Sequence, residues 1–206
     1  MISRLTSPVC NLTQKENKEL VHEGLLEELC GSEEGRALVD QIGNEGLNIY
    51  TSETAFPIIP GKIGLGFFDS TTYSRTGSAN IYVNRSLDTI AEVRSTGYRG
   101  SGREFQSLIL RHEVAEYNIF KASPGEPTWI RDAHARVVTD DFARQVNFQP
   151  WFPGMDLNDH LDANKPTPRN PDGYGRTEKA SDYHKMIADR ILIEGWDCSR
   201  VQSSKN

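Results

Sequence analysis

Residues 101–122 constrain the fold more than any other segment of the sequence. Ser101 and Glu104 have the spacing of a capping box, in which the serine hydroxyl and the glutamate carboxylate satisfy each other's exposed backbone N–H groups. A helix is therefore predicted to begin near residue 102 and to end before the Ser-Pro-Gly sequence at 123–125. Its apolar residues recur at helical spacing and predict one buried face: Phe105, Leu108, Ile109 and Phe120.

Two polar residues, His112 and Glu116, share that apolar face. They are four positions apart, so both side chains project from one side of the helix and can bind a single ion. Burial of a carboxylate without a partner is costly, and a metal ion would supply the partner. The alternative is an ordinary i,i+4 pair that contributes to helix stability without any metal.

The residue after the histidine, Glu113, gives the segment its catalytic potential. In HExxH metalloproteases the glutamate at this offset acts as general base beside the metal-bound water. Here Glu116 replaces the second histidine, and two histidines with one carboxylate form a known catalytic zinc set. His134 is the expected third ligand, because a short Pro-Gly connection should bring the next helix, from about 127 to 146, back as an antiparallel neighbour.

Four further residues are weaker candidates. Asp141 shares a helical face with His134 and is either a carboxylate that orients an imidazole or a solvated side chain. Tyr117 either stabilises an oxyanion or packs in the core. His184 is a fourth ligand, a hydrogen-bond donor or, as we favour, a surface residue. His160 shows no partner pattern and is expected at the surface.

The whole chain is expected to form one domain. Residues 46–85 contain short segments rich in β-branched and aromatic residues, which predict a small antiparallel sheet. Residues 177–194 are predicted to be helical, with Ile191 and Leu192 on the buried stripe. The sections are a helical N-terminal part at 1–45, a metal-binding core at 46–146, a Pro/Gly-rich loop at 147–176, and a C-terminal helix with a frayed tail at 177–206.

Composition excludes several classes of partner. A net charge of −6 argues against nucleic acid, whose affinity depends on Lys and Arg at the phosphates. No run of about 18 apolar residues could cross a membrane, and the N-terminus lacks the apolar core of a signal peptide. Cys10, Cys30 and Cys198 are odd in number and include no CxxC pair, which predicts free thiols in a reducing compartment. A cytoplasmic location is expected.

The HExxE helix at 108–120, preceded by strands and followed by the Ala-His-Ala sequence at 133–135, resembles the zincin-like metal-binding proteins of phage and bacterial genomes. In those proteins an AHxxA-type helix follows the HExxE helix. The likeness covers residues 80–145. It implies a zincin-like α+β fold, with a small, mostly antiparallel sheet packed on the active-site helix. It also implies His112, Glu116 and His134 as ligands and Glu113 as the catalytic acid/base.

These observations predict a zinc-dependent hydrolase, most simply a metallopeptidase that acts on a peptide or protein and binds Zn²⁺. The first alternative is a non-catalytic structural or interaction module of phage-related type, in which zinc joins the two helices. The second alternative has no metal, and the two helices simply pack as a hydrophobic core.

Overall fold

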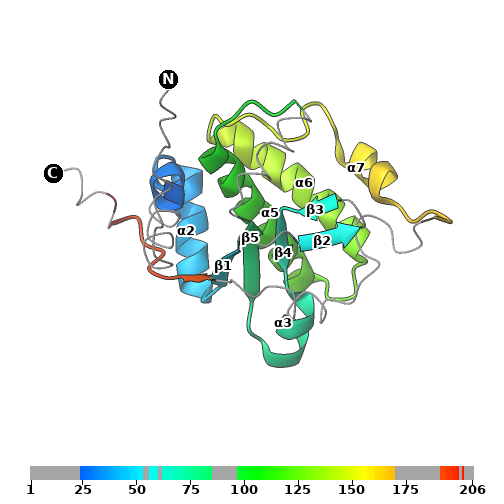
Figure 1. Ribbon diagram of the computed structural model, residues 1–206, viewed down its shortest axis with the longest axis horizontal. Helices are drawn as coiled ribbons and strands as arrows, with labels where there is room; N and C mark the ends of the chain where they lie inside the picture. Colours follow the sequence, from blue (N-terminus) through cyan, green and yellow to red (C-terminus); the bar gives the residue numbers. More distant parts are fainter. Residues whose placement is uncertain are drawn as a thin grey trace, which may run out of the picture.

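The computed structural model describes residues 24–52, 56–59, 62–84, 97–169, 191–199 and 201. Figure 1 shows their arrangement. A short unlabelled helix at 24–30 comes first. The elements that follow are α2 (Glu33–Glu45), β1 (Asn48–Ser52), β2 (Phe56–Ile59), β3 (Lys62–Gly64), β4 (Gly66–Phe68), α3 (Ser70–Thr76), β5 (Asn80–Asn84), α5 (Gly102–Ala122), α6 (Thr128–Gln145), α7 (Leu157–Asn164) and β6 (Ile191–Ile193).

A four-stranded mixed sheet has the strand order β4-β5-β1-β6. The central strands β1 and β5 run parallel, from Asn48 opposite Asn80 to Ser52 opposite Asn84. Both outer strands pair antiparallel with their neighbours, and β2 and β3 form a separate antiparallel hairpin. The predicted antiparallel pairing is thus correct for the edges and wrong for the centre, where the crossover between β1 and β5 allows parallel pairing.

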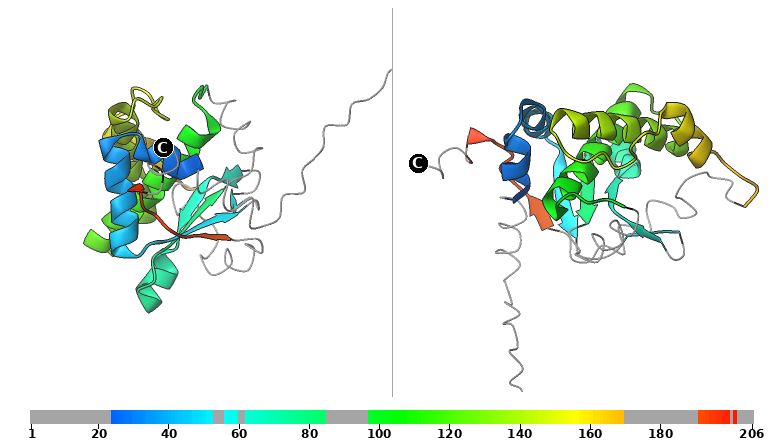
Figure 2. Two further views of the ribbon diagram at one scale, coloured as in Figure 1. Left: turned by 90° about the vertical axis from the view of Figure 1, so that its left-hand side faces the viewer. Right: turned by 90° about the horizontal axis from the view of Figure 1, so that it is seen from above.

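Helices cover one side of this sheet, and the core lies between the two layers (Figure 2). Helix α5 packs directly on β4 and β5, and α6 packs on α5. Buried side chains from both layers form one hydrophobic cluster, which includes Leu25, Ile42, Ile49, Ile81, Phe105 and Leu108. None of the helices in the described part of the chain is both long and apolar enough to cross a membrane.

The predicted start of α5 is confirmed, and α2 begins with a similar serine cap. The Ser101 hydroxyl accepts from the backbone N–H of Glu104, and the Glu104 carboxylate accepts from the backbone N–H of Ser101, which completes the capping box of α5. The Ser32 hydroxyl caps α2 by accepting from the N–H of Gly35. Helix α2 ends at Gly46, whose φ of 64° is the left-handed conformation that glycine adopts easily.

Two predictions for the second half of the chain are wrong. Residues 191–193 form strand β6, which pairs with β1, so Ile191 and Leu192 do not belong to a helix. The Pro/Gly-rich segment contains helix α7, which has its own capping box between Asp156 and Asp159. The rest of the predicted C-terminal helix, at 177–190, lies outside the described residues.

Cys30 and Cys198 form a disulfide, so the prediction of free thiols is wrong for these two residues. Their Cα atoms are 5.5 Å apart, although 168 positions separate them in sequence. The bond joins the helix at 24–30 to the segment just after β6. Because disulfides are rare in reducing compartments, this bond weighs against the cytoplasmic location, which stays a prediction. Cys10 lies outside the described residues.

Removal of this bond by the double substitution Cys30→Ser and Cys198→Ser is expected to lower the free energy of unfolding by about 2–5 kcal/mol, because the crosslink restricts the unfolded chain over a long loop. Denaturant titration of the variant and the oxidised parent measures the difference. Peptide mapping under non-reducing conditions is the control. Recovery of Cys30 and Cys198 as separate unlinked peptides would contradict the structure.

Candidate metal centre

Helix α5 contributes three buried ionisable residues in its middle turns: His112, Glu113 and Glu116 are only 7%, 6% and 5% exposed. The capping box sets the start of the helix, and the packing of Phe105 and Ile109 in the core sets its rotation. His112 and Glu116 consequently project from the same side, toward α6.

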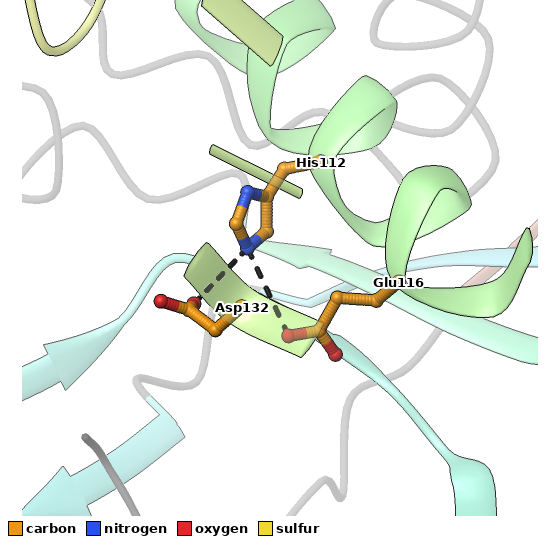
Figure 3. Close-up of side chains that lie close together, drawn as sticks. All are labelled: His112, Glu116 and Asp132. Carbon is orange, nitrogen blue, oxygen red and sulfur yellow. Dashed lines mark ion pairs between the residues drawn. The ribbon is translucent and has the colours of Figure 1, made fainter. Parts of the chain in front are cut away.

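The third member of the group is Asp132 from α6 (Figure 3). His112 Nε2 lies 3.3 Å from Asp132 Oδ1 and 3.9 Å from Glu116 Oε1. The three donor atoms all lie within 4.8 Å of one another. Ligands at about 2.1 Å from a tetrahedral zinc ion are separated by about 3.4 Å. The separations of 3.3 and 3.9 Å from His112 are close to this value, so the three residues could hold a metal ion.

The structure does not bring His134 into this group, in contrast to the sequence-based expectation. His134 is two positions after Asp132, and two helical positions are about 200° apart around the axis. When Asp132 faces α5, His134 therefore faces away, and it is partly exposed. The resulting donor set has one imidazole and two carboxylates, where the sequence had predicted two imidazoles and one carboxylate.

The unexpected rotation of α6 follows from the residues on its two faces. The side toward α5 carries small residues at four-residue spacing, Ala135, Thr139 and Ala143, all 0–1% exposed. Small side chains allow close approach of the helices, while Val137 and Val138 on the other side are only half-buried. This stripe of small residues is the sequence signal that marks the inward face of α6.

Each carboxylate of the group uses one oxygen toward His112 and the other toward an arginine. Glu116 Oε2 lies 3.5 Å from Nε of Arg131, and Asp132 Oδ2 accepts a hydrogen bond of 2.7 Å from Nε of Arg136. Both guanidinium groups are buried and lie over aromatic rings of other segments. The hydrogen bond from Arg136 holds Asp132 in a fixed orientation from behind, whereas Glu116 and Arg131 form a longer ion pair.

The local charge balance is close to neutral. Glu113, Glu116 and Asp132 supply three negative charges when ionised, and Arg131 and Arg136 supply two positive charges. With neutral His112 the sum is minus one, so a divalent cation would change it to plus one. Buried charges are tolerated only when they are paired, and this group is almost fully paired without an ion.

The same contacts shift the pKa of His112 and of Asp132 in opposite directions. Burial lowers the pKa of His112, but the hydrogen bond to Asp132 and the nearby carboxylates raise it more, so it lies above its ordinary value of 6.5. Burial raises the pKa of Asp132, but contacts with His112, Arg136 and Asn164 outweigh this and lower it below 3.8. The pair therefore favours imidazolium facing carboxylate.

Glu113, the predicted general base, lies beside the group and against the edge strand β4. A Cβ atom at Gly66 would be 2.6 Å from Oε1 of Glu113 and 2.6 Å from Cγ2 of Ile109. Only glycine fits at this point of β4 without displacing one of these side chains.

The weaker candidates lie elsewhere. The Tyr117 hydroxyl donates to Glu45 on α2, and burial together with this contact raises the pKa of Tyr117 to about 12. Asp141 is exposed and pairs with Arg144. His184 lies outside the described residues. His160 was expected at the surface, but it is fully buried on α7, and neither ring nitrogen has a hydrogen-bond partner among the described residues.

Comparison with models of known protein families gives no match, and searches among curated proteins and solved structures find no significant similarity. The zincin-like resemblance therefore stays a prediction. The mixed α and β content is observed, and the functional interpretation depends on the geometry of the His112, Glu116 and Asp132 group alone.

The raised pKa of His112 predicts how stability depends on pH in metal-free protein. When folding raises the pKa of a group, protonation of that group stabilises the folded state. This stabilisation is complete at pH values below the pKa of the unfolded chain, 6.5 for histidine, and is lost as the pH rises through the pKa of the folded protein. In the presence of a chelator, the parent should therefore have a higher free energy of unfolding than His112→Gln. This difference between the two proteins should be larger at about pH 5.5 than at about pH 8.5. Urea titrations at several pH values measure this difference, and a pH-independent difference would contradict it.

Proposed function

We propose that this protein binds a divalent metal ion, most simply Zn²⁺, and hydrolyses peptide bonds at that centre. The observation that supports the proposal is the buried group of His112, Glu116 and Asp132, whose donor atoms lie within 4.8 Å of one another. Each carboxylate in it is paired with an arginine behind it, and outer partners of this kind generally accompany the ligands of metal centres.

The chemistry of the donors is compatible with several divalent ions. Zinc accepts imidazole nitrogen and carboxylate oxygen, and three protein ligands leave a fourth position open. The Asp132 carboxylate takes the place of the expected second imidazole, so the donor set contains more oxygen ligands. Carboxylate oxygens also suit Mn²⁺. Zn²⁺ is the ion we propose, and Mn²⁺ is the comparison for binding experiments.

A bound divalent ion would polarise a substrate carbonyl and lower the pKa of water at the site. The residue proposed to move protons is Glu113, which directly follows His112 on α5 and is 6% exposed. Its carboxylate would accept a proton from the attacking water and deliver it to the departing amine. Contact with Gly66 would keep the carboxylate in place.

A second candidate function is a structural metal site without catalysis. The observation that favours it is the burial of all three donors, which are between 5% and 7% exposed, on two packed helices. A metal ion there would link α5 to α6 and add its binding free energy to folding.

Metal content of purified variants tests the ligand set. Asp132→Ala and Glu116→Ala should each lower the bound metal from about one equivalent to near zero, because two protein ligands rarely retain zinc. His134→Ala is the matched control on the same helix and should retain the metal. Elemental analysis of untagged protein measures the content. Loss in His134→Ala with retention in Asp132→Ala would contradict the geometry.

Glu113→Gln separates catalysis from structure. This variant should retain the metal, because Glu113 is not in the donor group, and it should lose at least about 100-fold in peptide hydrolysis if Glu113 is the general base. Equal hydrolysis by this variant and the parent would contradict that role. An inactive parent that binds metal and unfolds on chelation supports the structural function. A parent that binds no divalent metal contradicts both functions.

Gly66→Ala tests the position of Glu113 without altering a charge. The added methyl group would displace the Glu113 carboxylate or Ile109, and a misplacement of about 1 Å can lower a rate by about 100-fold. Hydrolysis should fall while metal content is retained. Gly125→Ala is the control, because a Cβ atom there meets nothing within 4 Å. Equal activity in both variants would contradict the proposed placement of the base.

A further inference from the structure

We propose that Asn164, at the end of α7, is a positioning residue of the metal centre, where it fixes Asp132 so that only Oδ1 faces the ion. This inference rests on the proposed metal binding. It adds to the site an element that lies more than 30 positions after Asp132, in the segment that the sequence predicts to be a loop.

Two donors from different helices converge on the same oxygen of Asp132. Asn164 Nδ2 donates to Oδ2 at 2.6 Å, and Arg136 Nε donates to Oδ2 at 2.7 Å. Oδ1 is the oxygen that faces His112 Nε2, at 3.3 Å. The carboxylate therefore has one oxygen engaged by the protein and the other directed toward the candidate ion.

The environment of Asn164 makes this contact strong and directional. Its side chain is only 1% exposed, and Nδ2 also lies 3.4 Å from the backbone oxygen of Trp129. Both neighbours of Nδ2 are acceptors, so the opposite amide orientation would place oxygen against oxygen. A hydrogen bond from an amide to a buried carboxylate is stronger than one between neutral groups.

Arg136 and Asn164 act differently on Asp132. Arg136 supplies charge as well as a hydrogen bond, so its removal changes both the electrostatics and the geometry of the site. Asn164 is neutral, so its removal leaves the formal charge unchanged and takes away one of the two hydrogen bonds that hold Oδ2, which leaves Arg136 alone to orient the carboxylate. Loss of such a partner of a ligand generally weakens metal binding by about 10- to 100-fold.

The contact also couples metal binding to the packing of α7 on α6. If docking of Asn164 favours the ion-binding orientation of Asp132, then ion binding must favour docking of Asn164 by the same factor. The amides of α7 should therefore exchange more slowly with solvent after metal is added.

Asn164→Leu tests the proposal with Asn158→Leu as a matched control. Asn158 is exposed on the same helix, so the same substitution there leaves the centre untouched. The measurement is the Kd for Zn²⁺ and for Mn²⁺ by competition with a chelating dye. Asn164→Leu should raise the Kd by about 10- to 100-fold, while Asn158→Leu should match the parent.

A readout of coordination distinguishes positioning from general destabilisation. With Co²⁺ as the bound ion, the visible absorption spectrum of Asn164→Leu should differ from that of the parent, because Asp132 is then held by Arg136 alone and its carboxylate takes a different orientation toward the ion. A Kd and a Co²⁺ spectrum unchanged in Asn164→Leu, with metal bound by the parent, overturn this inference alone. Absence of metal binding by the parent overturns the proposed function, and this inference with it.

Hydrogen exchange on the unaltered protein keeps the test decisive if Asn164→Leu does not fold. Addition of Zn²⁺ should slow amide exchange across 157–164 as well as in α5 and α6. Protection confined to α5 and α6 would overturn the proposed role of Asn164.

Discussion

The contact between α5 and α6 depends on a buried set of charges that must be satisfied together. His112 lies between the carboxylates of Glu116 and Asp132, and an arginine holds the far side of each carboxylate. Removal of one member would leave an unpaired charge in a medium of low dielectric constant, which costs several kcal/mol. The two helices therefore keep one relative rotation. That rotation decides which side chains of α6 are available as ligands.

The surrounding elements support this pair from three directions. The sheet lies under α5, with Gly66 of β4 against Glu113. Helix α2 contacts the C-terminal half of α5, where Glu45 accepts from both Tyr117 and Lys121. Helix α7 reaches the centre from the opposite side through Asn164. The disulfide between Cys30 and Cys198 joins segments from near the two ends of the chain, remote in sequence from the HExxE helix.

Elements whose ends carry local signals could be predicted from the sequence. The bounds of α2 and α5 follow from capping residues that act within one turn, and the Pro-Gly connection separates α5 from α6. Strand β6 could not be predicted, because Ile191 and Leu192 fit a helical stripe and become a strand only by pairing with β1. His160 lacked any local pattern, and its burial follows from the packing of α7 on α6.

The sequence by itself determined that His112, Glu113 and Glu116 occupy one helix and that two of them share a face, since the helical repeat sets those positions. Only the tertiary structure decided that Asp132 completes the group and His134 does not. The physical reason is that side chains two positions apart on α6 point in nearly opposite directions. Local sequence does not set the rotation of one helix against another; here it follows from close packing at Ala135 and Ala143 together with the pairing of buried charges.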